Sequence, residues 1–194
     1  MKRALIAALA AVLPLAAGAA PASATDLPTV VTVEDPHGDM KTNWSPRQAS
    51  RPLDIYWVRG ARVGTNLVLT IKVKDLTETN TRQIEDGAWR WMASGLSVAF
   101  RADGRDYTTF YSVFGTASVD GPDGSICEDS NPFDSIVEGA QSRPNLDTER
   151  MRLIIPLDCL GNPKVARIMV ARTQAEGSKE WRDDTRSSRR FSLR

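Results

Sequence analysis

Two carboxylates flank a short turn sequence near the N-terminal end of the chain. Asp35 and Asp39 enclose a Pro-His-Gly tripeptide, and loop carboxylates and carbonyls are the ligands that Ca²⁺ takes in extracellular domains. We therefore name Asp35 and Asp39 as a candidate calcium site. The alternative is that both side chains only accept hydrogen bonds that shape the turn. Asp120 and Asp123 in Asp-Gly-Pro-Asp-Gly form a weaker candidate, and neither segment has the EF-hand spacing.

Trp89 and Trp91 are the residues best suited to contact a sugar. They lie two positions apart, so in an extended segment their side chains point to the same side. The flat apolar faces of sugar rings stack on exposed indoles, whereas indoles buried in a β-core have the same appearance in a sequence. We therefore name Trp89 and Trp91 as candidate ligand contacts. The alternative is that both side chains pack in the sheet or core.

His37 is the only histidine of the chain. Hydrolase triads need a base beside the nucleophile, and no Gly-x-Ser-x-Gly motif accompanies this residue. A zinc site takes three or four ligands, mostly nitrogen and sulfur, which one histidine does not supply. Two carboxylates suffice for a glycoside hydrolase, but no spacing singles out one pair among the 24 Asp and Glu residues. The sequence favours a non-catalytic protein that requires no cofactor, with a glycan-acting hydrolase as an alternative.

The first residues have the pattern of an export signal. Lys2 and Arg3 precede an Ala/Leu-rich apolar run that ends in Ala22-Ser-Ala24, the small-x-small pattern of a signal-peptidase site. We expect residues 1–24 to be a cleaved Sec signal peptide and residues 25–194 to form a single secreted, extracellular domain. The sequence contains no second apolar stretch that could span a bilayer.

The chain has two cysteines, Cys127 and Cys159, and their expected state depends on whether the protein is exported. In an oxidising compartment, a chain with two cysteines is expected to join them in a disulfide. Closing a loop of this length contributes about 3–4 kcal/mol in the loop-entropy model. We therefore expect a structural disulfide rather than a reactive or metal-binding thiol.

Charge is balanced over the chain but not along it. The 25 Lys and Arg residues face 24 Asp and Glu residues, which argues against nucleic acid as a partner, because phosphate binding needs a basic surface. The segment Lys164–Arg194 has nine basic and four acidic residues. One interpretation is a solvated surface or attraction to the acidic segment between Tyr107 and Ser142, which has no Lys or Arg. The other is a strip that contacts an anionic cell-wall polymer. We expect a monomer.

The elements that position these candidate residues are predicted to be mostly β-strands. Apolar residues alternate with polar ones over Leu67–Lys74, and two alternating runs, Leu96–Arg101 and Tyr107–Val113, flank Asp103-Gly104, the strongest short hairpin signal. Weaker patterns predict strands at Thr29–Val33, Asp54–Arg59, Arg152–Pro156, Ala166–Arg172 and Arg190–Leu193. No apolar run keeps the helical period over three turns. The fold class expected is all-β, a jelly-roll-like antiparallel β-sandwich with one disulfide.

Three short motifs carry a resemblance to known proteins. They are Asp35-Pro-x-Gly-Asp39, Asp54-Ile55 before the Leu67–Asp75 strand, and Cys159-Leu-Gly-Asn-Pro163. In this order the chain resembles a group of small secreted actinobacterial proteins, and more loosely it is similar to DOMON and carbohydrate-binding-module β-sandwiches. The first resemblance implies a sandwich with one disulfide and no particular activity. The second implies ligand binding between or upon the sheets, and no functional residue is carried over from either.

The function expected from the sequence is a secreted, non-catalytic binding module for a cell-envelope or environmental polysaccharide. The alternative is a structural or protein-interaction component of the cell envelope that uses an exposed strand or the basic C-terminal segment. Dependence of binding on Trp89 and Trp91, against dependence on salt alone, separates the two hypotheses.

Overall fold

The architecture is all strand. The computed structural model describes residues 27–39, 41–42, 53–74, 76, 83–85, 88–90, 95–111, 117–127, 139–175 and 181–194. Every regular element in these ranges is a β-strand. A search of the same ranges finds no helix long and apolar enough to cross a membrane.

The first sheet has five strands in the order β1, β3, β4, β12 and β11. Their bounds are β1 Val30–Glu34, β3 Ile55–Val63, β4 Asn66–Val73, β12 Arg150–Pro156 and β11 Gln141–Asn145. All four pairings are antiparallel. The register between β3 and β4 shifts between Ile55 and Trp57, where β3 is bulged.

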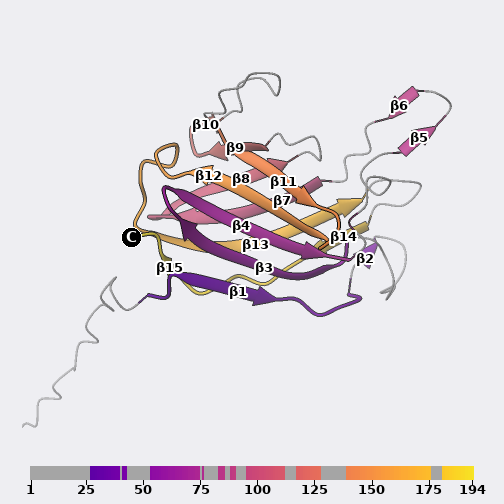
Figure 1. Cartoon of the computed structure of the whole chain (residues 1–194), viewed down its shortest axis with the longest axis horizontal. Helices are drawn as coiled ribbons and strands as arrows, with labels where there is room; N and C mark the ends of the chain where they lie inside the picture. Colours follow the sequence, from indigo (N-terminus) through magenta and orange to yellow (C-terminus); the bar gives the residue numbers. More distant parts are fainter. Residues whose placement is uncertain are drawn as a thin grey trace, which may run out of the picture.

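The second sheet runs in the order β10, β9, β8, β7, β13, β14 and β2, and β15 pairs with β13. The bounds are β10 Gly124–Ile126, β9 Ala117–Gly121, β8 Arg105–Tyr111, β7 Gly95–Ala102, β13 Val165–Ala175, β14 Trp181–Asp184, β2 Lys41–Thr42 and β15 Phe191–Ser192. A separate two-stranded ribbon pairs β5 Gln83–Glu85 with β6 Ala88–Arg90. Figure 1 shows β3, β4 and β12 lying over β7, β8 and β13, the arrangement of a sandwich.

The strand patterns of the sequence place the core between these sheets. On β4, Leu67, Leu69, Ile71 and Val73 are fully buried while the alternate residues are half-buried. Phe100 and Ile168 of the other sheet belong to the same buried cluster. The predicted alternation of the Leu67–Lys74 strand is confirmed, and so is the all-β sandwich.

The hairpin predicted around Asp103-Gly104 is confirmed as β7–β8. Asp103 has φ 43° and Gly104 has φ 86°, as a type I′ turn requires at both central positions. The Asp103 carboxylate accepts hydrogen bonds from the backbone N–H groups of Lys164 and Val165, each at 3.0 Å. The turn residue therefore also fixes the start of β13.

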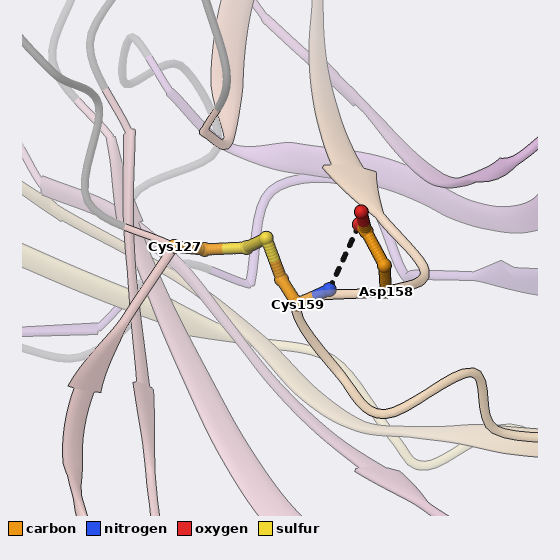
Figure 2. The surroundings of a disulfide bond; sticks show 3 residues. All are labelled: Cys127, Asp158 and Cys159. Carbon is orange, nitrogen blue, oxygen red and sulfur yellow. Dashed lines mark hydrogen bonds between the residues drawn. A yellow bond between two sulfur atoms is a disulfide. The ribbon is translucent and has the colours of Figure 1, made fainter.

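The predicted disulfide is present and joins the two sheets. Cys127 follows β10 and Cys159 lies in the turn after β12, with the two Cα atoms 5.6 Å apart. Figure 2 shows the bridge, together with the bond from the backbone N–H of Cys159 to Oδ1 of Asp158 at 2.9 Å. The cross-link thus ties one edge strand of the eight-stranded sheet to the connection between β12 and β13.

Candidate metal centre

The turn that follows β1 is held by the start of β3. The backbone N–H of Asp35 donates to the carbonyl of Tyr56 at 3.0 Å. Gly38, at φ 77°, donates its N–H to Oδ2 of Asp54 at 2.7 Å. The ring of His37 stacks on the ring of Tyr56 with centroids 4.0 Å apart. These contacts direct the carboxylates at both ends of the turn toward the same place.

A third carboxylate comes from the other sheet. Asp183 lies on β14, where its side chain is buried and the neighbouring Arg182 and Asp184 are exposed. Its Oδ2 accepts a hydrogen bond at 2.7 Å from the backbone N–H of Ile55, at the start of β3. A side chain of the eight-stranded sheet therefore satisfies a backbone group of the five-stranded sheet.

Asp35, Asp39 and Asp183 form one cluster. Each offers a carboxylate oxygen, and the three oxygens lie within 4.8 Å of one another. Ca²⁺ binds oxygen at 2.3–2.6 Å, so ligands on opposite sides of one ion are separated by about 5 Å. The three oxygens could therefore all bind one calcium ion.

Several oxygens of this region are buried without a hydrogen-bond donor. Among the described residues, Oδ2 of Asp35, Oδ1 of Asp39 and Oδ1 of Asp54 have no partner. The exposed fraction of Asp35 is 6% and that of Asp54 is 3%. An ionised oxygen that is buried without a donor is strongly unfavourable. A bound cation would satisfy the carboxylates of Asp35 and Asp39, which belong to the cluster.

The electrostatics of the cluster agree with its geometry. Burial, followed by the negative charges of Asp183, Asp39 and Asp54, raises the pKa of Asp35 to about 7, against the opposing charge of Arg186. Burial also raises the pKa of Asp183 to about 6, although hydrogen bonds from the backbone of Ile55 and Asp184 oppose it. Without a cation, protons thus relieve the repulsion among these groups, and a metal ion would compete for the same oxygens.

The sequence predicted part of this cluster. The structure brings Asp35 and Asp39 together, and calcium binding itself stays a prediction. Asp183 and Asp54 were missed, because neither belongs to a recognisable metal motif and only the fold brings them to the turn. The weaker candidate is not among the three-acid groups of the described residues: Asp120 lies on β9 and Asp123 is exposed at the tip of the β9–β10 turn.

Of the other candidate residues, His37 belongs to the turn between Asp35 and Asp39, whereas the side chains of Trp89 and Trp91 are not described. Trp89 lies on β6, and only the backbone of that strand is described. Trp91 lies outside the described residues, so sugar stacking on this pair stays a prediction. His37 is exposed at the surface of the turn.

Comparisons with known proteins do not assign the chain to a family. No protein-family model, curated protein or solved structure matches it. The function is therefore argued from the residues of this chain alone.

Proposed function

We propose that this protein is an exported, non-catalytic binding module whose two sheets are joined by a calcium ion. Asp35, Asp39 and Asp183 are its ligands, and Asp54 positions the turn through Gly38. The observation that carries the proposal is the set of three carboxylate oxygens within 4.8 Å of one another, two from the connection between β1 and β2 and one from β14. Bound there, the ion supplies positive charge between β14 and the turn after β1.

The donor set favours calcium over other cations. All candidate ligands are carboxylate oxygens, which suit hard cations, whereas zinc and copper prefer nitrogen and sulfur. Mg²⁺ binds oxygen at 2.0–2.1 Å in a nearly ideal octahedron. Three carboxylates from a turn and a strand, with oxygens within 4.8 Å of one another, are compatible with the larger and more adaptable shell of Ca²⁺.

Burial favours a structural ion over catalysis. A glycoside hydrolase also uses two nearby carboxylates, of which the general acid has a raised pKa and the other stays ionised. Asp35 and Asp183, however, are exposed by only 6% and 3%, and a polymer substrate cannot reach groups covered to that extent. We therefore favour a binding protein over a glycoside hydrolase.

Export is proposed from two independent features of the chain. The sequence of residues 1–24 has the order of a Sec signal. The Cys127–Cys159 disulfide fits an oxidising compartment. Outside the cell, calcium is abundant enough to fill a site of modest affinity, and extracellular modules bind it with Kd values of about 10⁻⁴–10⁻³ M.

Calorimetric titration of the metal-free protein with CaCl₂ tests the proposal. We expect one ion per chain, and at ten times Kd a stabilisation of about 1.4 kcal/mol, or roughly 3–6 °C in melting temperature. Asp183→Asn should abolish both effects, because it removes a ligand charge while keeping an oxygen for the N–H of Ile55.

Asp123→Asn is the matched control. It removes the same charge from an exposed turn residue and should titrate as the wild type does. Titration of the wild type without heat or thermal shift would refute the site, as would equal binding by Asp183→Asn.

A further inference from the structure

The outer face of the five-stranded sheet carries a line of arginines. Arg59 on β3 pairs in register with Thr70 on β4, Thr70 pairs with Arg152 on β12, and Arg152 pairs with Arg143 on β11. Residues paired in register share one face of a sheet. Arg59, Arg143 and Arg152 are exposed. Three guanidinium groups thus lie in one row across the strands.

A second row runs beside the first. Trp57, Lys72 and Arg150 are paired in register across β3, β4 and β12. The Arg150 guanidinium lies 5.3 Å from the centre of the Trp57 ring, and Trp57 is half-buried. Basic groups and an indole therefore adjoin the arginine row on the same face.

The positive charge of this face is largely uncompensated. Within the described part of the chain, Arg59, Arg143, Arg150 and Arg152 form no ion pair, while Lys72 pairs with Glu149. The whole chain has a formal charge of only +1. Four arginines without an ion pair thus share this face with Glu34, the exposed acid of β1 that pairs in register with Trp57.

The basic C-terminal segment uses part of its charge internally. Arg172 and Arg182 both pair with Asp184. Arg167 donates to the carbonyl of Ser188 and to the hydroxyl of Ser187, each at 2.8 Å. Within the described residues Arg186, Arg189, Arg190 and Arg194 of this segment are exposed without an ion pair. The arginines of the sheet differ from them in lying in register across adjacent strands.

We propose that the outer face of β3, β4, β12 and β11 binds an acidic polysaccharide that carries uronate carboxylates. This inference deepens the proposed binding function and rests on it. Guanidinium groups bind carboxylates through paired, charge-assisted hydrogen bonds. Neighbouring strands are about 4.8 Å apart, comparable to the length of one sugar unit, so a chain lying across the strands meets Arg59, Arg152 and Arg143 in turn.

One side chain within the row, Thr70, suits the uncharged parts of such a polymer. The hydroxyl of Thr70, between Arg59 and Arg152 in register, can donate to or accept from a sugar hydroxyl. The indole of Trp57 is half-buried and has the Arg150 guanidinium over its ring, so it supports that arginine on the face. A lipid surface fits less well, because the most exposed apolar side chains of these strands and β1 are the short Val63 and Val30, and interfacial anchoring uses long apolar or aromatic side chains.

Binding to polygalacturonate tests the inference, with methyl-esterified polygalacturonate as the uncharged counterpart. We expect the wild-type protein to bind the acidic polymer, to lose affinity as salt rises, and to bind the ester at least about tenfold more weakly. Arg59→Gln/Arg152→Gln should lose about tenfold or more for the acidic polymer. The control Arg105→Gln/Arg190→Gln removes two exposed arginines elsewhere and should bind as the wild type does.

Each contrary result has a definite meaning. Equal binding of the acidic polymer and its ester, or equal losses in the two double variants, would overturn the inference. Stronger retention on phosphatidylglycerol vesicles than on the polymer would overturn it in favour of a membrane surface. Repeating the assay in EDTA separates this inference from the calcium proposal, since polymer binding that survives without calcium supports the arginine row even if the metal centre fails its own titration.

Discussion

At the scale of the residue, Asp183 links the candidate metal centre to the start of β3. It lies on β14 but accepts its hydrogen bond from Ile55 of the opposite sheet, and it shares a cluster with Asp35 and Asp39. The pattern of the sequence identifies the turn carboxylates, because a Pro-His-Gly turn between two aspartates is visible locally. It does not identify Asp183, whose neighbours in sequence form an ordinary charged strand.

Protonation of the cluster predicts an unusual dependence of stability on pH. In the folded protein the pKa is about 7 for Asp35 and about 6 for Asp183, against an ordinary value of 3.8. Between about pH 4 and 7 the folded chain therefore binds more protons than the unfolded chain, so these groups make stability fall as pH rises through this window. Asp39, Asp54 and Arg186 are the charged groups that face them.

Melting temperatures in EDTA, measured from pH 5 to pH 8 for the wild type and Asp183→Asn, check this prediction. The wild type should lose stability relative to the variant as pH rises, and the variant should be the more stable of the two at pH 8. Saturating calcium should reverse that order at pH 8. A constant difference between the two proteins across the pH range would contradict the account.

Gly60 is a residue whose small size the packing requires. A Cβ atom added there would lie 2.8 Å from Cζ of Phe191, which is fully buried. Gly60→Ala should lower the free energy of unfolding by about 1–3 kcal/mol through overpacking. Urea denaturation measures the loss, and adding Phe191→Leu to Gly60→Ala should recover part of it. A double variant with strictly additive losses would show that the two positions do not clash.

At the scale of the element, the strands with regular alternation are predictable and the irregular ones are not. β4 and the β7–β8 hairpin follow from apolar residues at every second position and from a turn that tolerates positive φ. β11 contains Pro144, and it lies at a sheet edge, where a missing N–H is tolerated. β14 is only Trp181–Asp184 and is held by pairing with β13 rather than by a pattern of its own.

The disulfide allows a prediction at the same scale. Because Cys127 and Cys159 join β10 to the turn after β12, replacing both by serine should free the β9–β10 edge from the rest of the sandwich. We expect a loss of about 3 kcal/mol in the free energy of unfolding, measured by urea denaturation. Hydrogen exchange should increase first in β9 and β10, and uniform acceleration over both sheets would contradict this local role.

At the scale of the whole molecule, the two proposals assign different parts of the sandwich to different tasks. The metal centre lies where the turn after β1 meets β14, so it joins the sheets. The arginine row lies on the outer face of β3, β12 and β11. The sandwich is predictable from strand patterns, whereas both surfaces depend on register and on contacts between residues distant in sequence. For that reason the sequence indicated the basic C-terminal segment, and not the arginine row, as the surface that contacts an anionic polymer.

The most direct test of the calcium proposal is a crystal structure of the protein grown in CaCl₂, with anomalous diffraction data. The account predicts one anomalous peak bound by carboxylate oxygens of Asp35, Asp39 and Asp183 at about 2.3–2.6 Å. Crystals of Asp183→Asn grown in the same solution should lack it. Ordered density for the three carboxylates with no ion among them, or calcium only on exposed acids such as Asp123, would contradict the proposal.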